Sequence, residues 1–243
     1  MVSDAFNIAI TNFILFFIVI VARKIISNDP VNSFLVFKKN KNKRLFLEGS
    51  LVGFILIHIY VIIIMLSNVG QLQLNFSINI KFLYVILSFT VSFLAVSLFE
   101  ETLFRDYILF KLRNRFGTEK AILFSSVLFS LLHIFGYLST GNLTVIGLLN
   151  AFFIGILLSV VVISTHSIMW ALGFHLFWNL TQTIFLDIEI GGIILNIDKG
   201  IWAGTKSIPE AGLIVTVVLF VLYIYILKRF DASYLMPKIQ GFG

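Results

Sequence analysis

Long apolar segments alternate with short polar segments along the whole chain. Because a helix of about 20 apolar residues crosses the hydrocarbon core of a bilayer, each apolar segment is a candidate membrane span. The segments comprise residues 5–26, 49–67, a run that is uncharged from 82 to 99, 121–136, 143–163, 168–186 and a last one that ends at 228–229. The pattern predicts an all-α fold: a polytopic membrane helix bundle with about seven transmembrane spans, formed as a single domain by residues 1–243.

The polar connections leave the number of spans open. An eighth span or a re-entrant segment fits within residues 28–39 or 187–206. The first apolar segment has no basic residue ahead of it and no A-x-A-like site behind it, so we expect a retained span rather than a signal peptide. Ser207 and Glu210 have the spacing of a capping box, which predicts that they open the last helix.

The third apolar segment is expected to continue as a helix beyond its uncharged part, because no Gly or Pro follows before Gly117. This places Glu100, Glu101 and Arg105 inside the bilayer, where each charge costs roughly 2.5–3.5 kcal/mol on insertion scales. On an α-helix Glu101 and Arg105 lie one turn apart with the acid first, the favourable order for an ion pair, whereas Glu100 points about 100° away. We therefore assign the chemistry to Glu100, and structural and electrostatic support to Glu101 and Arg105.

Composition agrees with a membrane protein and narrows its chemistry. Of 243 residues, 59% are hydrophobic and 12% are charged, and the mean hydropathy is +1.02. A soluble domain has about a quarter of its residues charged. The chain has no cysteine, which excludes disulfides, cysteine nucleophiles and thiolate metal sites. Histidine, carboxylate and hydroxyl groups remain for chemistry.

The basic residues predict how the chain lies in the membrane. The net charge is +6, but the basic residues flank the apolar segments, so we expect a lipid bilayer and no nucleic acid as partner. With seven spans and the amino terminus outside, 15 of the 18 basic residues fall on one side, which the positive-inside rule assigns to the cytoplasm. The abundance of Phe, Ile, Asn and Lys suggests an A/T-rich bacterial genome and hence a bacterial plasma membrane.

Other polar residues of the uncharged region are predicted to meet Glu100 at one depth. Counted from the basic ends at about 1.5 Å per residue, Glu100 lies about 16 Å deep, His133 about 20 Å and Asn179 about 18 Å. His175 and Asn179 share a helix face, being four residues apart. A single residue of this kind is usually polar glue between helices. A carboxylate, two imidazoles and a carboxamide at one depth favour a water-filled cavity with a catalytic role.

Three motifs occur in order on successive predicted spans. They are Glu100-Glu101-x-x-x-Arg105, Phe129-x-x-x-His133 and His175-x-x-x-Asn179. The ordered set resembles the CaaX-protease and bacteriocin-processing (CPBP, Abi-type) intramembrane endopeptidases, over about residues 82–186. The resemblance implies an all-helical membrane peptidase whose Glu100, His133, His175 and Asn179 line a cavity open to the cytoplasm, with Phe129 in a supporting role.

Two catalytic schemes suit these residues. In one, Glu100 is the general base that activates water, helped by His133, while His175 and Asn179 stabilise the oxyanion. In the other, Glu100, His133 and His175 hold a divalent metal such as zinc with an open position for water. The sequence has no His-Glu-x-x-His motif, and both schemes have been proposed for the family, so metal dependence stays open.

The expected substrate is a membrane-associated peptide or protein. Since bacteria generally do not prenylate their proteins, a bacteriocin or signalling-peptide precursor is a better expectation than a prenylated one. Two other functions stay open. One is a catalytically silent scaffold or bacteriocin-immunity protein of the same fold, and the other is a proton-coupled transporter, since intramembrane Glu and His also serve as proton relays.

Overall fold

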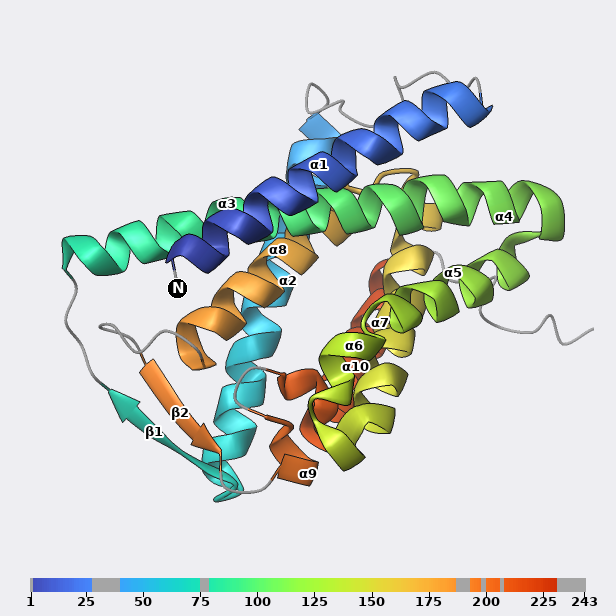
Figure 1. Ribbon diagram of the computed structural model, residues 1–243. Coiled ribbons are helices and arrows are strands. Elements are labelled where there is room, and N and C mark those ends of the chain that lie inside the picture. The colour runs from blue at the N-terminus through green and yellow to red at the C-terminus, as the bar shows by residue number, and fades with distance from the viewer. Residues whose placement is uncertain are drawn as a thin grey trace, which may run out of the picture.

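The computed structural model describes residues 2–27, 40–74, 79–186, 193–197, 200–205 and 208–230 (Figure 1). Its helices are α1 (Val2–Ser27), α2 (Asn40–Leu66), α3 (Ile80–Glu100), the π-helix η2 (Glu101–Ile108), α4 (Leu109–Phe116), α5 (Thr118–Leu132), α6 (Ile134–Leu138), η3 (Gly141–Leu143), α7 (Thr144–Thr165), α8 (Met169–Leu186), α9 (Gly200–Ala203), η4 (Pro209–Ala211) and α10 (Leu213–Arg229). Two strands, β1 (Gly70–Leu74) and β2 (Ile193–Ile197), complete the fold. The predicted helical architecture is confirmed.

Helices α3, η2 and α4 form one continuous rod, as the sequence predicts, and α1 lies along it (Figure 1). Near the start of the rod, Ser92 Oγ donates a hydrogen bond to the carbonyl oxygen of Ala5 at 2.5 Å. Near its end, Arg23 of α1 forms an ion pair with Asp106 of η2. Helices α1 and α3 therefore run in the same direction.

The rod changes from α- to π-helix at Glu101, directly after Glu100. An i→i+5 turn is rare and is found mostly at functional sites. In this stretch Glu101, Thr102, Phe104 and Arg105 are all buried. The π-helix thus lets acid, base and aromatic side chains of one short segment all face the protein interior.

Helices α2 and α8 pack backbone to backbone through glycines. A methyl group on Gly49 would overlap the Trp170 carbonyl oxygen, and one on Gly53 would lie 2.6 Å from the Phe174 carbonyl oxygen. Gly173 of α8 approaches the Phe46 carbonyl group of α2 in the same way. Small residues four apart allow this close approach between membrane helices. The α2–α8 seam, meaning these three glycine contacts, fixes the helix that carries His175.

The two polar connections contain a feature that the sequence analysis did not predict. β1 and β2 pair antiparallel, with Gly70 opposite Ile197 and Leu74 opposite Ile193. The resulting ribbon joins the segments that follow α2 and α8 (Figure 1). Ribbon pairing satisfies backbone groups that a polar loop would leave to water.

The predicted capping box does not open the last helix. Helix α10 begins at Leu213, with Gly212 as its N-cap residue, and Glu210 lies in the short 3₁₀ turn η4 before it. Ser207 lies outside the described residues. The carboxylate of Glu210 bonds to Trp178 of α8 instead, because it points into the bundle.

Four helical stretches of the described chain are long and apolar enough to cross a membrane: Ser3–Ile26, Asn40–Leu66, Ile80–Phe116 and Gly141–Thr165. The other three predicted spans form α5, α8 and α10, with 15, 18 and 17 residues. At 1.5 Å per residue these helices reach only about 22–27 Å, less than a bilayer core of about 30 Å. The expected count of seven spans is therefore not confirmed.

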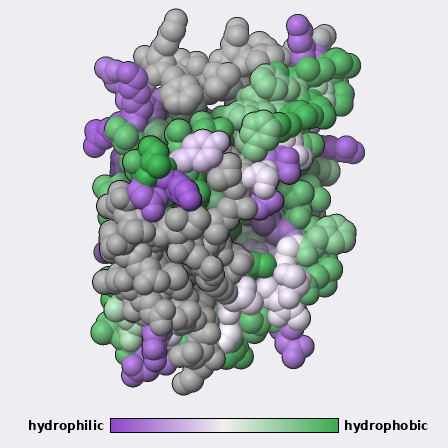
Figure 2. Space-filling model, turned by 60° about the vertical axis from the view of Figure 1, so that its left-hand side comes forward, coloured by the Kyte–Doolittle hydropathy of each residue, from purple (hydrophilic) through white to green (hydrophobic). Residues whose placement is uncertain are grey.

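The outer surface of the bundle suits lipid. Exposed large hydrophobic residues are spread over α1, α2, α3, α5, α7 and α10. Figure 2 shows hydrophobic side chains over much of one flank, with hydrophilic ones at its upper and lower ends and in smaller patches between them. Among the described side chains of α8, no large hydrophobic one is exposed. Helix α8 is thus the buried centre of the bundle, and the chain is an integral membrane protein.

Candidate active site

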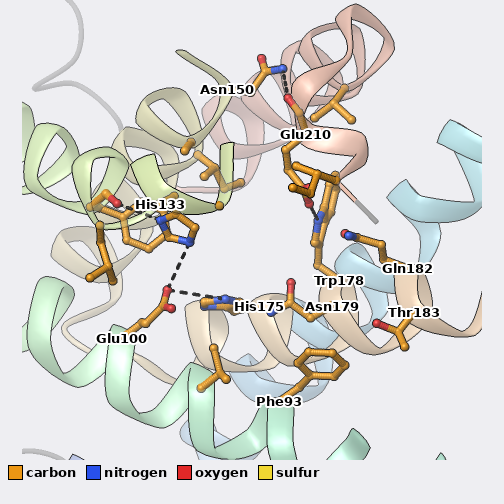
Figure 3. Close-up of a pocket in the computed structure, with 18 of the residues that line it drawn as sticks. Phe93, Glu100, His133, Asn150, His175, Trp178, Asn179, Gln182, Thr183 and Glu210 are labelled. Carbon is orange, nitrogen blue, oxygen red and sulfur yellow. Dashed lines mark hydrogen bonds and ion pairs between the residues drawn. The ribbon is translucent and has the colours of Figure 1, made fainter. Parts of the chain in front are cut away.

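A pocket of about 640 Å³ lies inside the bundle (Figure 3). Its walls come from α1, α3, the α5–α6 junction, α7, α8, the η4 turn and the start of α10. The predicted residues Glu100, Phe129, His133, His175 and Asn179 all line it. The structure therefore brings together side chains that lie up to 79 positions apart in the sequence (179 − 100).

Glu100 faces both histidines across the pocket (Figure 3). Its Oε2 atom lies 3.8 Å from Nε2 of His133 and 3.9 Å from Nε2 of His175. Oε2 is buried and has no hydrogen-bond partner among the described residues. A buried carboxylate oxygen without a partner is costly, so this atom is available to a ligand such as water.

His175 is held from behind by Glu101. Its Nδ1 lies 2.9 Å from Oε1 of Glu101, which also accepts a hydrogen bond from Nη1 of Arg105 at 3.3 Å. A carboxylate oxygen only accepts, so Nδ1 carries the proton and Nε2 points toward Glu100. The ion pair predicted between Glu101 and Arg105 is present. Glu101 has the further task, which the sequence analysis did not foresee, of orienting His175.

His133 is held by its own helix. It ends α5, and its Nδ1 lies 2.9 Å from the carbonyl oxygen of Phe129. Because a carbonyl only accepts, Nδ1 again carries the proton and Nε2 faces Glu100. The Phe129 ring covers the guanidinium of Arg105, with 3.9 Å from Cζ to the ring centroid. Phe129 thus supports both His133 and the Glu101–Arg105 pair.

Asn179 lies one helical turn beyond His175 on the pocket wall (Figure 3). In the part of the chain that the structure describes, no residue forms a hydrogen bond with its carboxamide. The predicted shared face is therefore present, and the carboxamide is free to bind a ligand.

The sequence analysis missed several other polar residues of the pocket. Trp178, Gln182 and Thr183 extend the His175 face of α8, and Asn150 comes from α7. Positions 175, 178, 179 and 182 follow the i, i+3, i+4, i+7 pattern of one helix face, which was a readable signal. Glu210 was visible as an acidic residue ahead of the last apolar segment, but it was interpreted as a cap.

The imidazole and carboxylate groups of the pocket are of the kinds that bind zinc, but they lie further apart than zinc ligands do. Each histidine has Nδ1 bonded to an oxygen and Nε2 directed inward, which is how metal-binding histidines are usually held. Two ligands of tetrahedral zinc lie about 3.4 Å apart, less than the separations seen here. Within the described ranges, no group of three His, Asp or Glu residues is placed to hold a metal ion. As they lie, Glu100 and the two histidines are spaced more widely than the ligands of a tetrahedral zinc site.

The described lining of the pocket contains no residue from the basic helix ends. Lys41 bonds to the last residue of α7, and Arg229 at the end of α10 pairs with Glu48 near the start of α2, so the basic ends lie together. The lining comes from the second half of α3, the middle and second half of α8, the first and middle parts of α7 and the start of α10. We expect both the basic ends and the cavity to face the cytoplasm, and this orientation stays a prediction.

Comparison with known proteins supports the resemblance seen in the motifs. Residues 81–181 match the sequence model of a family described as "Type II CAAX prenyl endopeptidase Rce1-like". The match covers all seven motif residues that the sequence analysis singled out. No curated protein and no solved structure shows significant similarity to the chain.

Proposed function

Residues 81–181 carry the pattern of the CAAX-type intramembrane protease family, and from this we propose that the chain is an intramembrane endopeptidase. Its substrate is a membrane-associated peptide or protein precursor. The observation that supports the proposal most directly is the buried Glu100 Oε2, which faces two imidazole nitrogens across a pocket and lacks a hydrogen bond among the described residues.

Glu100 is proposed as the general base. A water molecule between Glu100 and the scissile carbonyl gives its proton to Oε2 as its oxygen attacks the carbonyl carbon. The carbonyl π electrons move to oxygen, and a tetrahedral oxyanion forms. When this intermediate collapses, the C–N bond breaks, and the proton held by Glu100 passes to the leaving nitrogen. His133, next to Oε2, assists both proton transfers.

His175 and Asn179 are proposed to stabilise the oxyanion. Since Nδ1 of His175 already donates to Glu101, Nε2 donates only when the ring is protonated. The Glu101 carboxylate, bonded to the ring at 2.9 Å, favours that positively charged form. The Asn179 amide group adds a neutral donor one turn away. Donors placed in advance where charge develops supply a large part of enzymatic rate enhancement.

The direct test is cleavage by the purified full chain in lipid nanodiscs, using a library of quenched fluorescent peptides with apolar segments. Glu100→Gln keeps the size of the side chain but cannot take a proton, so we expect cleavage to fall by about 10²–10⁴-fold. Glu119→Gln, the same change on an exposed residue of α5, is the matched control. Equal rates in the two variants would contradict the role of Glu100.

A wild-type chain that cleaves no member of the library would favour the hypothesis of a catalytically silent scaffold or immunity protein. Movement of protons or of intact peptide across a sealed membrane would favour the transporter.

A further inference from the structure

The carboxylates packed inside the bundle differ in their partners. Among the described residues, five acidic side chains lie in its interior, and four of them face a basic or imidazole group. These are Glu48 with Arg229, Glu101 with Arg105, Asp106 with Arg23, and Glu100 beside His133 and His175. The fifth, Glu210, forms no ion pair among the described residues and interacts with His133 and His175 only at longer range.

Glu210 is held firmly in the pocket wall. Nδ2 of the buried Asn150 donates to the Glu210 carbonyl oxygen at 2.8 Å and to that of Gly212 at 3.1 Å. Oδ1 of Asn150 accepts a hydrogen bond from Thr216 of α10 at 2.9 Å. One asparagine thus fixes both the η4 turn and the start of the next helix, and the Glu210 carboxylate is positioned rather than loose.

Within the described chain, one side chain bonds to this carboxylate. Oε1 accepts a hydrogen bond from Nε1 of Trp178 at 2.7 Å, and no side chain of another described residue bonds to Oε2. Figure 3 shows Glu210 and Trp178 together on the wall across the pocket from Glu100. Burial raises the pKa of the Glu210 carboxyl. A cation bound beside it would favour the charged form.

The rest of the pocket suits a positive charge. Its described lining contains three carboxylates (Glu100, Glu210 and Asp4) and two histidines (His133 and His175), but no lysine or arginine. Six aromatic rings also line it: Phe89, Phe93, Phe129, Tyr137, Phe174 and Trp178. A carboxylate beside an indole ring is a favourable place for an ammonium or guanidinium group, which is attracted to both the negative charge and the ring face. A substrate carboxylate would meet repulsion here.

We propose that Glu210 and Trp178 form a specificity subsite for a positively charged group of the substrate, a basic side chain or a free α-amino group close to the scissile bond. The inference rests on the proposed peptidase function, and it narrows the substrate to peptides that carry a cation within an otherwise apolar segment. Glu210 acts on selection of the substrate, whereas Glu100 acts on its hydrolysis.

Direct binding tests the subsite independently of cleavage. The full chain in nanodiscs is titrated with two apolar peptides whose amino end is acetylated and whose carboxyl end is amidated. The peptides are identical except at one position, which is lysine in one peptide and norleucine in the other. We expect the wild-type chain to bind the lysine peptide roughly 10- to 30-fold more tightly. Glu210→Gln keeps an acceptor for Trp178 but removes the charge, so the preference should disappear, whereas Glu119→Gln should keep it. A third peptide, with norleucine and a free α-amino group, distinguishes a terminal amine from a basic side chain as the bound cation.

The outcomes separate the two proposals. Equal binding of all three peptides by the wild-type chain overturns the subsite, and this measurement needs no variant that has to fold. A loss of lysine and norleucine binding alike in Glu210→Gln, with the thermal unfolding temperature unchanged, also overturns it, because a structural role would affect both peptides. Selective binding without cleavage supports the subsite and contradicts the peptidase, whereas cleavage without selectivity contradicts the subsite alone.

Discussion

Two regions of the bundle differ in how they treat their charges. At the basic helix ends, two ion pairs form within the chain: Arg23 pairs with Asp106, and Arg229 with Glu48. Around the pocket, Glu100 and Glu210 form no ion pair with a lysine or arginine among the described residues. The ion pairs join helix ends, which suits a structural role. The pocket keeps polar groups available to a ligand.

The orientation in the membrane stays a prediction: the positive-inside rule places the basic ends in the cytoplasm, and we expect the pocket to open to the same side. The following predictions test the contrast between the two regions, beginning with the largest expected effect.

The largest effect is expected in labelling, because accessibility is all or none. The chain has no cysteine, so single cysteines at Asn40 and Asn142 report on the two ends without background. Both positions are exposed, Asn40 at the start of α2 and Asn142 ahead of α7. We expect a membrane-impermeant thiol reagent on intact cells to label Asn142→Cys and not Asn40→Cys, and to label both after permeabilisation. The opposite pattern would invert the predicted topology and move the pocket to the outer face of the membrane.

The second prediction compares packing in the α2–α8 seam with packing at the pocket. A methyl group on Gly173, in the α2–α8 seam, overlaps the Phe46 carbonyl group, whereas one on Gly136, at the pocket, meets nothing within 4 Å. We expect Gly173→Ala to lower the free energy of unfolding by about 3 kcal/mol or more, since backbone cannot move aside as a side chain can. Gly136→Ala should change it by less than about 1 kcal/mol. Thermal unfolding in detergent measures both, and equal stabilities would show that the seam is not rigid.

The third prediction leaves the fold intact and concerns His175, which joins the rigid seam to the pocket. As an oxyanion donor, His175 should be partly replaced by another donor, so His175→Gln is expected to lose about 10²–10³-fold in rate rather than all activity. Metal analysis of the purified protein accompanies the assay. About one zinc per chain, lost together with all activity in this variant, would contradict the donor role and make the protein a metallopeptidase.

The sequence was informative where one residue carries a large energetic cost. A charge at membrane depth is so unfavourable that Glu100, Glu101 and Arg105 identified the site region, and helical spacing placed His175 and Asn179 on one face. The Glu101–His175 bond could not be predicted, because it depends on how two helices meet across 74 residues of sequence. The motif Gly49-x-x-x-Gly53 was readable as a packing signal, but its partner on α8 was not.

Glu210 shows how a local pattern can mislead. Its spacing from Ser207 fits a capping box, and a cap is the common role for an acid before a helix. In the structure, tertiary contacts with Trp178 and Asn150 determine its position instead. The lengths of the short helices α5 and α10 likewise depend on tertiary context. The length of an apolar segment can be read from the sequence, but the depth at which neighbouring helices bury it cannot.

The α2–α8 seam also sets an order of events during synthesis. Gly49 and Trp170 are 121 positions apart (170 − 49), so α2 leaves the ribosome about 6 to 24 seconds before its partner at 5–20 residues per second. Every helix between them must be inserted before α8 can dock, and His175 arrives with α8. A nascent chain that already contains Glu100 and His133 but not α8 therefore has no complete site. The proposed activity can begin only after α8 has docked against α2.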